Sequence, residues 1–301
     1  MSALEQTIIK FIAENCLLNE GDKLLIAFSG GADSVFALSF LDKYKDKYKI
    51  QICAFHVNHS LRGSESDTDE EFCRVMCKNM NIEFYSEKVN VSAFAKNRKL
   101  SIEEAARNIR YEKLNDILRI SNSNKIVTAH NLDDNTETVL LNLFRGSGLK
   151  GLSGIPIKRD NIIRPFLLAN KNKIILYLNK RGIKFRVDST NNENQFKRNY
   201  LRNEIIPKIK DQINQGVDQN IFKFSQIAKN SEIIINNEVK NIISEFVTFT
   251  ESEIKILKKI KIVAPLIMGE VFKQTIEEKF SVSIEYDNIL SIQKIIDLQV
   301  G

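Results

Sequence analysis

The stretch 29–34 reads SGGADS and places two glycines between hydroxyl side chains and a carboxylate. Gly30 and Gly31 allow backbone N–H groups to approach phosphate oxygens without a Cβ in the way, and the serine hydroxyls can donate further hydrogen bonds. Asp33 can cap the following helix and assist a magnesium ion that bridges phosphates. A tight turn without ligand is the alternative. We predict a nucleotide site formed by Ser29, Gly30, Gly31, Ala32, Asp33 and Ser34, with Asp33 as the magnesium ligand.

Two common nucleotide motifs do not fit the chain. A Walker A loop needs Gly-Lys followed by Ser or Thr, and no Gly-Lys pair occurs anywhere in the sequence. Residues 146–151 (GSGLKG) match G-x-G-x-x-G, but they follow a helix-like segment, whereas the dinucleotide fingerprint must follow a strand. The sequence therefore disfavours an ordinary nucleoside triphosphatase and a nicotinamide site.

A second polar group lies in the stretch 128–138, TAHNLDDNTET, where a strand-like run passes into a helix-like one. Asp133 and Glu137 are four residues apart and share a face if both are helical. With His130, such carboxylates can bind magnesium or hold an amine cation. The alternative is that Asp134 caps a helix whose acidic first turn is solvated.

Histidine and cysteine residues suggest a further possibility. His56, His59 and Arg62 follow another strand-like run, and Cys73 and Cys77 lie one helical turn apart. A zinc site could in principle use the histidines and cysteines, but the familiar paired C-x-x-C spacing is absent. Cysteines on a half-buried helix are more often small apolar residues, which is the reading we favour.

Basic residues gather in two places. Arg107, Arg110 and Tyr111 lie on neighbouring faces of one predicted helix, where the arginines can neutralise phosphate or pyrophosphate, with surface ion pairing as the alternative. Residues 158–210 hold fourteen Lys and Arg against four Asp and Glu, although the whole chain has a net charge of only +6. Such a local excess suggests nucleic acid, and a lysine-rich solvated face is the alternative.

These side chains must be positioned by strands and helices that alternate along the first half of the chain. The apolar, β-branched runs 24–28, 50–55, 82–89 and 125–129 predict strands, and 33–44, 67–80 and 101–119 predict helices. A capping box, Ser101 with Glu104, begins the last helix. This alternation predicts a doubly wound, mainly parallel α/β sheet, in which ligands bind at the carboxyl ends of the strands.

The character of the sequence changes after Arg145, first to a glycine-rich loop and then to the basic stretch. Beyond about residue 215 it is helical in pattern and rich in lysine and isoleucine. We predict an N-terminal catalytic domain over 1–210 and a smaller helical domain over 211–301. No apolar run approaches the roughly 20 residues needed to span a bilayer, and four scattered cysteines suit a reducing compartment. We therefore expect no membrane association and a cytoplasmic location.

Taken together, the motifs resemble those of a known superfamily. SGGADS is similar to the SGGxDS loop of the N-type ATP pyrophosphatases, or PP-loop superfamily, which cleave ATP between the α- and β-phosphates to adenylate a substrate. Within it, the chain resembles the tRNA(Ile)-lysidine synthetase family over residues 20–210. The motifs that carry this resemblance are HVNHSLR, EEAARNIRYEKL, AHNLDDNTETVLLNLFRGSGLKGLSGI, IIRPFL and DSTNNENQFKRNYLRNEIIP.

The resemblance implies an adenine nucleotide alpha hydrolase-like fold and a two-step ligation that uses ATP and Mg²⁺. ATP would activate C2 of the wobble cytidine of an isoleucine tRNA with a CAU anticodon, and free L-lysine would then displace AMP. It implies catalytic roles for Asp33, His130, Asp133 and Glu137, with Asp133 and Glu137 holding lysine. It also implies contacts with tRNA or phosphate by Arg107, Arg110, Arg145, Arg198 and Arg202. The oligomeric state stays open, with a homodimer as one alternative.

The chain departs from the family pattern at two points. The usual His-His-x-Asp-Asp-Gln is here His130-Asn131-Leu132-Asp133-Asp134-Asn135, and many members carry a further C-terminal domain beyond the point where this chain ends in DLQVG. A short member and a truncated chain both fit that ending. Three other functions also stay open: a tRNA thiolase, which would need cysteine pairs; a small-molecule amidotransferase or synthetase, which would need no basic segment; and a noncatalytic nucleotide- or tRNA-binding module.

Overall fold

The computed structural model describes residues 1–60, 63–187, 197–284 and 286–297. The chain divides into two units, Met1–Ser147 with Gly154–Phe224, and Gly148–Ser153 with Ser225–Gly301. Helix α11 (Val217–Phe246) begins in the first unit and ends in the second. The predicted domain boundary at residue 210 therefore stays a prediction. Arg62 and the whole DSTNNENQF stretch, residues 188–196, lie outside the described residues.

The first unit contains a six-stranded sheet with the strand order β3-β2-β1-β4-β6-β5. All neighbouring strands pair in parallel except β5 and β6, which are antiparallel at the edge. This confirms the predicted mainly parallel α/β sheet. The order of the strands along the chain reverses between β1 and β4, which is where such sheets bind ligands. The strands are β1 (Lys23–Ala27), β2 (Gln51–Asn58), β3 (Glu83–Lys88), β4 (Lys125–Val127), β5 (Lys158–Arg159) and β6 (Ile162–Ile163).

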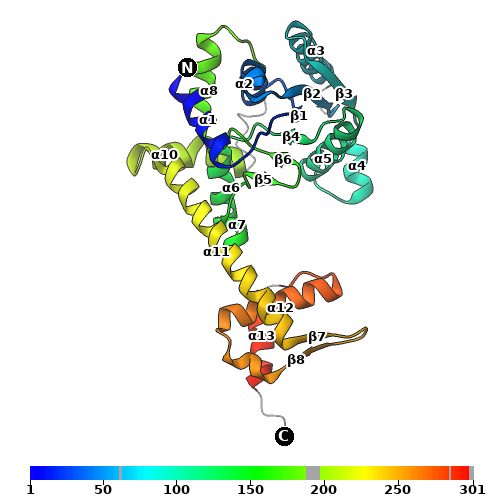
Figure 1. The fold of residues 1–301 in the computed structure, drawn as a ribbon, viewed down its shortest axis with the longest axis vertical. Coiled ribbons are helices and arrows are strands. Elements are labelled where there is room, and N and C mark those ends of the chain that lie inside the picture. The colour runs from blue at the N-terminus through cyan, green and yellow to red at the C-terminus, as the bar shows by residue number, and fades with distance from the viewer. Residues whose placement is uncertain (61–62, 188–196, 285, 298–301) are drawn as a thin grey trace. The chain divides into compact units, whose positions relative to one another are not determined.

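Helices cover both faces of this sheet (Figure 1). In β1, Leu24 and Ile26 belong to the core shared with α1, α2, α3 and α8, whereas Leu25 belongs to the core beneath α5. Successive residues of a strand point to opposite faces, so a strand buried on both sides is apolar without interruption. The helices are α1 (Ala3–Glu14), α2 (Ala32–Tyr48), α3 (Ser64–Asn79), α4 (Val91–Arg98), α5 (Ile102–Ile120), α6 (Leu132–Phe144) and α8 (Lys171–Lys180).

Some elements were not predicted, or differ from the prediction. β5 and β6 have two residues each, too few to show a periodicity. Residues 149–152, read as loop, form the single turn α7 (Leu149–Leu152). In the basic stretch, residues 197–212 form three consecutive helical segments: α9 (Lys197–Tyr200), a π-helical turn η2 (Leu201–Ile205) and α10 (Ile206–Gln212). Pro207 has no N–H to donate, so a regular α-helical hydrogen bond is lost at this point.

The second unit is mainly helical, as predicted, and contains a short hairpin that was not. The hairpin strands β7 (Val247–Phe249) and β8 (Ile254–Ile256) pair antiparallel. They are followed by a 3-10 helix η3 (Lys258–Ile262), α12 (Pro265–Phe280) and α13 (Tyr286–Asp297). The core of this unit includes Val239, Phe246 and Phe272. Within the described residues, no helix combines the length and apolar character needed to cross a bilayer.

Candidate active site

The SGGADS loop joins the end of β1 to the start of α2. Gly30 has a φ of +82°, and a Cβ there would lie 3.1 Å from Cys73 Sγ, so the position favours glycine both in backbone angle and in packing. Ser34 Oγ donates to the Gly31 carbonyl at 3.0 Å and accepts from the Ser29 N–H at 3.2 Å. Gly31, the N-cap of α2, makes no side-chain cap, so the first N–H groups of this helix can bind an anion.

Asp33 lies in the first turn of α2 with 26% of its side chain exposed. Its Oδ1 accepts a hydrogen bond from Asn131 Nδ2 at 2.9 Å, and its Oδ2 lies 3.7 Å from Lys171 Nζ. Burial raises the pKa of this carboxyl group, while the Lys171 charge and the Asn131 hydrogen bond act in the opposite direction. Two polar side chains from other elements therefore fix the orientation of the Asp33 carboxylate.

Asn131 links this carboxylate to helix α6. Its Oδ1 accepts from the Asp134 N–H at 2.9 Å, and Asp134 Oδ2 accepts from the Asn131 N–H at 3.0 Å, so the two residues form a capping box. Asn131 is 1% exposed. One amide side chain thus caps α6 and orients Asp33. The family pattern usually has a histidine at this position, and the pattern therefore did not predict this role for Asn131.

We expect Asn131→Ala to lower the free energy of unfolding by about 1–2 kcal/mol, because it removes a helix cap and leaves the Asp33 carboxylate without its donor. Urea denaturation of the purified variant measures this change. Asn115→Ala, at an exposed position of α5, is the matched control and should cause no loss. Equal stability of the two variants would show that the Asn131 contacts do not contribute to folding.

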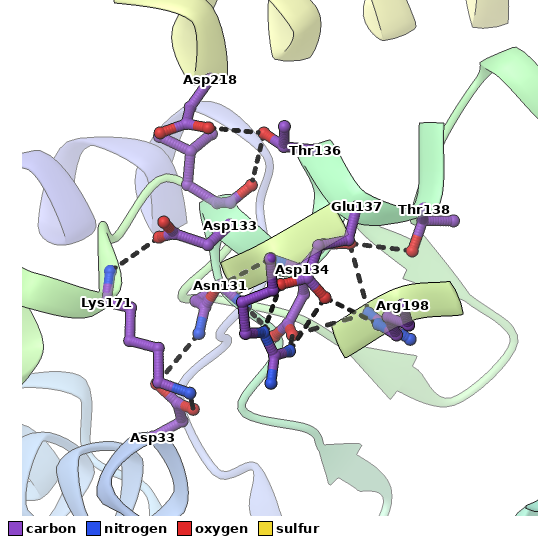
Figure 2. Close-up of polar contacts among 12 residues, drawn as sticks. Asp33, Asn131, Asp133, Asp134, Thr136, Glu137, Thr138, Lys171, Arg198 and Asp218 are labelled. Atoms are coloured by element: carbon purple, nitrogen blue, oxygen red, sulfur yellow. Dashed lines mark hydrogen bonds and ion pairs between the residues drawn. The ribbon is translucent and has the colours of Figure 1, made fainter. Parts of the chain in front are cut away.

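Glu137, on α6, is 1% exposed and lies between two arginines (Figure 2). Arg198 Nε donates to Glu137 Oε2 at 2.7 Å, and Arg202 Nε donates to Oε1 at 2.6 Å. Both guanidinium groups also lie 3.6 Å from Asp134 Oδ1. Four charged groups from α6, α9 and η2 therefore form one ion-pair network at the edge of the site.

Asp133 belongs to a different network. Its Oδ2 accepts from the Lys171 backbone N–H at 2.8 Å, and its Oδ1 lies 3.3 Å from Lys210 Nζ. Lys210 also lies 2.6 Å from Asp218 Oδ2, and Asp218 accepts a hydrogen bond from Thr136 at 3.0 Å. These contacts join α6 to the beginning of α8, to α10 and to the beginning of α11.

The structure therefore does not bring Asp133 and Glu137 together. Although both are on α6, they point to different sides of it and each is paired with its own cations (Figure 2). Neither residue lines the cleft described below. The expectation that these residues jointly hold an amine rested on the assumption that both carboxylates are unpaired and lie on one helix face. Their cationic partners follow 60 or more positions later in the chain, and the local sequence does not reveal such pairs.

The histidines near the strand ends are neutral. Burial, reinforced by the charge of Arg164 and other arginines, lowers the pKa of His130 to about 3, and its Nδ1 lies 2.9 Å from Thr128 Oγ1. Burial and the Arg110 charge lower the pKa of His59 to about 4. Burial also lowers the pKa of His56, whose Nδ1 lies 3.0 Å from the Phe28 carbonyl oxygen and 3.5 Å from Cys73 Sγ.

Cys73 and Cys77, the two cysteines considered for a metal site, behave as buried apolar residues. Cys73 and Cys77 are fully buried, and burial raises the pKa of the Cys77 thiol to about 12. Among the described residues, no three His, Cys, Asp or Glu side chains gather closely enough to hold a metal ion by themselves. The structure thus gives no support to the zinc alternative.

A cleft of about 780 Å³ opens at the carboxyl ends of β1, β2 and β4. Most of the predicted site residues line it, namely Ser29, Gly31, Ala32, Asp33, Ser34, Arg110, His130, Arg198 and Arg202. Arg107 is exposed on α5 outside the cleft lining, and Arg145 is exposed at the C-cap of α6. The cleft lies at the reversal of strand order, where the fold predicts a ligand.

Sequence reasoning missed several residues that line the cleft. Lys171 lies beside Asp33, and Arg186 donates from Nε to Asp69 Oδ1 at 2.7 Å. The Arg186 N–H also donates to the Gly30 carbonyl at 2.9 Å, which joins the residue to the SGGADS loop. Neither cation belongs to a motif in the sequence, and the only available signal was the general excess of basic residues over 158–210.

Comparison with known proteins gives consistent results. The family described as "PP-loop domain" matches residues 1–209. A protein of Clostridium tetani named tRNA(Ile)-lysidine synthase is 33% identical over 98% of this chain and 63% of its own length. One of the same name from Clostridioides difficile is 38% identical over 77% of this chain and 51% of its own length. The chain thus spans about half to two thirds of the length of these relatives.

A solved structure shares the fold. The U34-tRNA thiolase NcsA from Methanococcus maripaludis, solved with its [4Fe-4S] cluster, matches with a TM-score of 0.62 and 18% sequence identity. The match covers 75% of this chain and 78% of the thiolase. At this identity the similarity concerns the fold of the chain alone.

Proposed function

The chain belongs to the PP-loop domain family, and from this premise we propose that it ligates lysine to C2 of the wobble cytidine in an isoleucine tRNA with a CAU anticodon. ATP would be converted to AMP and pyrophosphate in the process. The observation that carries the proposal is the cleft at the strand reversal, which combines a phosphate loop lacking a P-loop lysine with Asp33. The lysidine synthase relatives support the choice of substrate.

ATP binding is assigned to the loop formed by Ser29, Gly30, Gly31, Ala32 and Ser34. Backbone N–H groups at the start of α2 would hold phosphate oxygens, aided by the positive end of that helix. Because no lysine occupies this loop, nothing in it resembles the group that holds the γ-phosphate in a Walker A site. This fits a reaction at the α-phosphate.

The cleft also fits a magnesium ion. Mg²⁺ usually keeps several waters and takes one or two carboxylates together with substrate phosphates, rather than a complete protein cage. Asp33 and Asp134 both line the cleft and are close enough for Asp134 to raise the pKa of Asp33. They would hold the ion, which would neutralise charge on the phosphates when bound.

In the first step, the C2 carbonyl oxygen of cytidine would attack the α-phosphorus of ATP, and the bond to the β-phosphate would break to release pyrophosphate. A carbonyl oxygen is a poor leaving group until it carries the adenylyl group. The guanidinium groups of Arg198 and Arg202 line the cleft and would stabilise the negative charge that develops on the phosphates. Glu137 and Asp134 would keep these two groups in position.

In the second step, the ε-amine of lysine would attack C2, and AMP would leave with the oxygen. Asp33 and Asp134 face the cleft and would attract the ammonium form of lysine, whereas Asp133 and Glu137 would act indirectly by holding α8, α9 and α10. The amine must lose a proton before it attacks. His130 is neutral at pH 7 and, with a pKa of about 3, would be a hydrogen-bonding group rather than the base.

The direct test is transfer of labelled lysine to an isoleucine tRNA transcript bearing CAU, with ATP and Mg²⁺. We expect transfer to this transcript, and none to the same transcript in which the wobble cytidine is replaced by uridine. The C4 amino group of cytosine donates electron density through N3 to O2 and makes that oxygen a better nucleophile than the C2 carbonyl oxygen of uracil, which competes with a second carbonyl at C4. Absence of transfer to the intact substrate would refute the assignment. ATP–pyrophosphate exchange without any tRNA would instead favour a small-molecule synthetase. A protein with this function would act in the cytoplasm, where tRNA is modified.

A further inference from the structure

Four arginines surround Tyr111 at the α5 side of the sheet. The guanidinium carbons of Arg107 and Arg159 lie 5.6 and 5.7 Å from the centroid of its ring. Arg110 lines the cleft together with Tyr111. Arg164, directly after β6, is 2% exposed and lies close enough to Tyr111 for that residue to influence the pKa of its guanidinium group. We call these five residues the arginine–tyrosine cluster.

Among the residues that the structure describes, no acidic side chain balances the positive charge of this cluster. No carboxylate in the described parts of the chain lies within 4.0 Å of any of the four guanidinium groups. One Nη of Arg164 donates to the Pro156 carbonyl at 2.7 Å, but its Nε is buried and has no acceptor among the described residues. A buried guanidinium without a counter-charge is costly, and an anion would remove that cost.

On the side of the cleft that faces the phosphate loop, the positive charges are paired with carboxylates. There Lys171 pairs with Asp33, Arg186 pairs with Asp69, and the two arginines of the α9–η2 segment pair with acids of α6. Of the cluster, Arg110 and Tyr111 line the cleft. The cleft therefore has one side, beside the phosphate loop, in which cations and anions alternate, and one side, at Arg110 and Tyr111, where the only charged groups of the cluster among the described residues are cations. An anionic ligand would be attracted to the second side, and a cationic one such as free lysine would be repelled from it.

The cluster is also separate from the phosphate loop. The loop opens helix α2, which packs on the core of one face of the sheet, whereas α5 packs on the core of the other face. Arg164 follows β6, two strands away from β1, which corresponds to about 10 Å. Phosphates bound by the loop and anions bound by the cluster would thus occupy different sides of the crevice.

We propose that the arginine–tyrosine cluster binds phosphodiester groups of the RNA strand that carries the target base, so that RNA and ATP enter the cleft from opposite faces of the sheet. This inference rests on the proposed function. Arginine suits the role because its planar guanidinium donates two parallel hydrogen bonds to a phosphate. Tyr111 holds the side chains of Arg107 and Arg159 against its ring and offers a surface on which a base can stack.

The test compares Arg159→Ala with Arg119→Ala. Arg119 is exposed near the C-terminal end of α5, twelve residues and thus about 18 Å along the helix from Arg107, so its substitution removes the same charge outside the cluster. Affinity for the CAU transcript is measured at several KCl concentrations, and affinity for ATP is measured separately. We expect Arg159→Ala to weaken RNA binding about tenfold and to lower the slope of log affinity against log salt by about one. ATP binding should stay unchanged, and Arg119→Ala should match the wild type in both assays.

Three outcomes would overturn the inference. Equal weakening by both variants would indicate a general effect of net charge. Unchanged RNA binding together with weaker competition by inorganic pyrophosphate would assign the cluster to the leaving group. If the wild-type protein did not bind the RNA, RNA would be excluded as the ligand of the cluster. If Arg159→Ala alone lost RNA affinity, while the wild-type protein transferred no lysine, the RNA site would be supported and the proposed reaction would be refuted.

Discussion

Replacing Asp33 by alanine is expected to reduce lysine transfer by about a hundredfold to a thousandfold while the protein stays folded. Asp33 is the carboxylate of the phosphate loop, and its orientation is fixed by Asn131 and Lys171. Its loss would remove a group that faces the phosphates and the position proposed for the magnesium ion. Steady-state lysine transfer to the CAU transcript, with circular dichroism of the same samples, measures both parts of the prediction.

Two further variants sharpen this result. Asp33→Asn keeps an oxygen that can accept from Asn131 but removes the charge, so activity should be nearly as low as in the alanine variant. Asp46→Ala, which removes an exposed acid near the other end of α2, should behave like the wild type. Full activity of Asp33→Asn would show that the carboxylate charge is not required and would contradict the assigned role.

Replacing Glu137 by alanine is expected to destabilise the protein by about 3 kcal/mol. Glu137 is buried and accepts hydrogen bonds from both Arg198 and Arg202, so its removal would leave two guanidinium groups without their main partner. The attachment of α9 and η2 to α6 would weaken, and lysine transfer would fall because both arginines line the cleft. Urea denaturation measures the stability of the variant.

The matched control for this variant is Glu204→Ala. Glu204 pairs with Lys208 at 3.6 Å on an exposed helical surface, where such pairs contribute about 0.5 kcal/mol or less. Glu137→Gln keeps the shape of the side chain and should lie between the two. If Glu137→Ala were no less stable than Glu204→Ala, the buried network would not be the feature that docks the α9–η2 segment.

The fold and the phosphate loop could be predicted because their signals are local. Leu24, Leu25 and Ile26 are apolar since β1 is buried on both faces, and the glycines of the loop follow directly after it. Ser101 and Glu104 form the predicted capping box, which marks the start of α5. Each of these features depends on residues within a few positions of one another, so a periodicity or a short motif is enough to reveal it.

The partners of the site residues could not be predicted in the same way. A carboxylate on α6 can either face the cleft or pair with a cation. Which of the two occurs depends on where residues 198–218 pack against α6, and no local sequence pattern encodes that packing. The same holds for Lys171 beside Asp33, a contact that joins residues 138 positions apart. Asn131 illustrates the point most clearly, because its cap is a local feature, whereas its hydrogen bond to Asp33 joins residues 98 positions apart.

The position of β1 at the centre of the sheet has a consequence for synthesis on the ribosome. β1 pairs with β2 after a short crossover, but its other neighbour, β4, comes about a hundred residues later, as the Lys23–Asn124 hydrogen bond across 101 positions shows. At 5–20 residues per second, that edge of β1 stays without its partner for about 5–20 s after it is made. An apolar strand with an open edge can pair with other chains. The nascent protein should therefore depend on chaperones until β4 has emerged, even though the finished sheet buries the same edge completely.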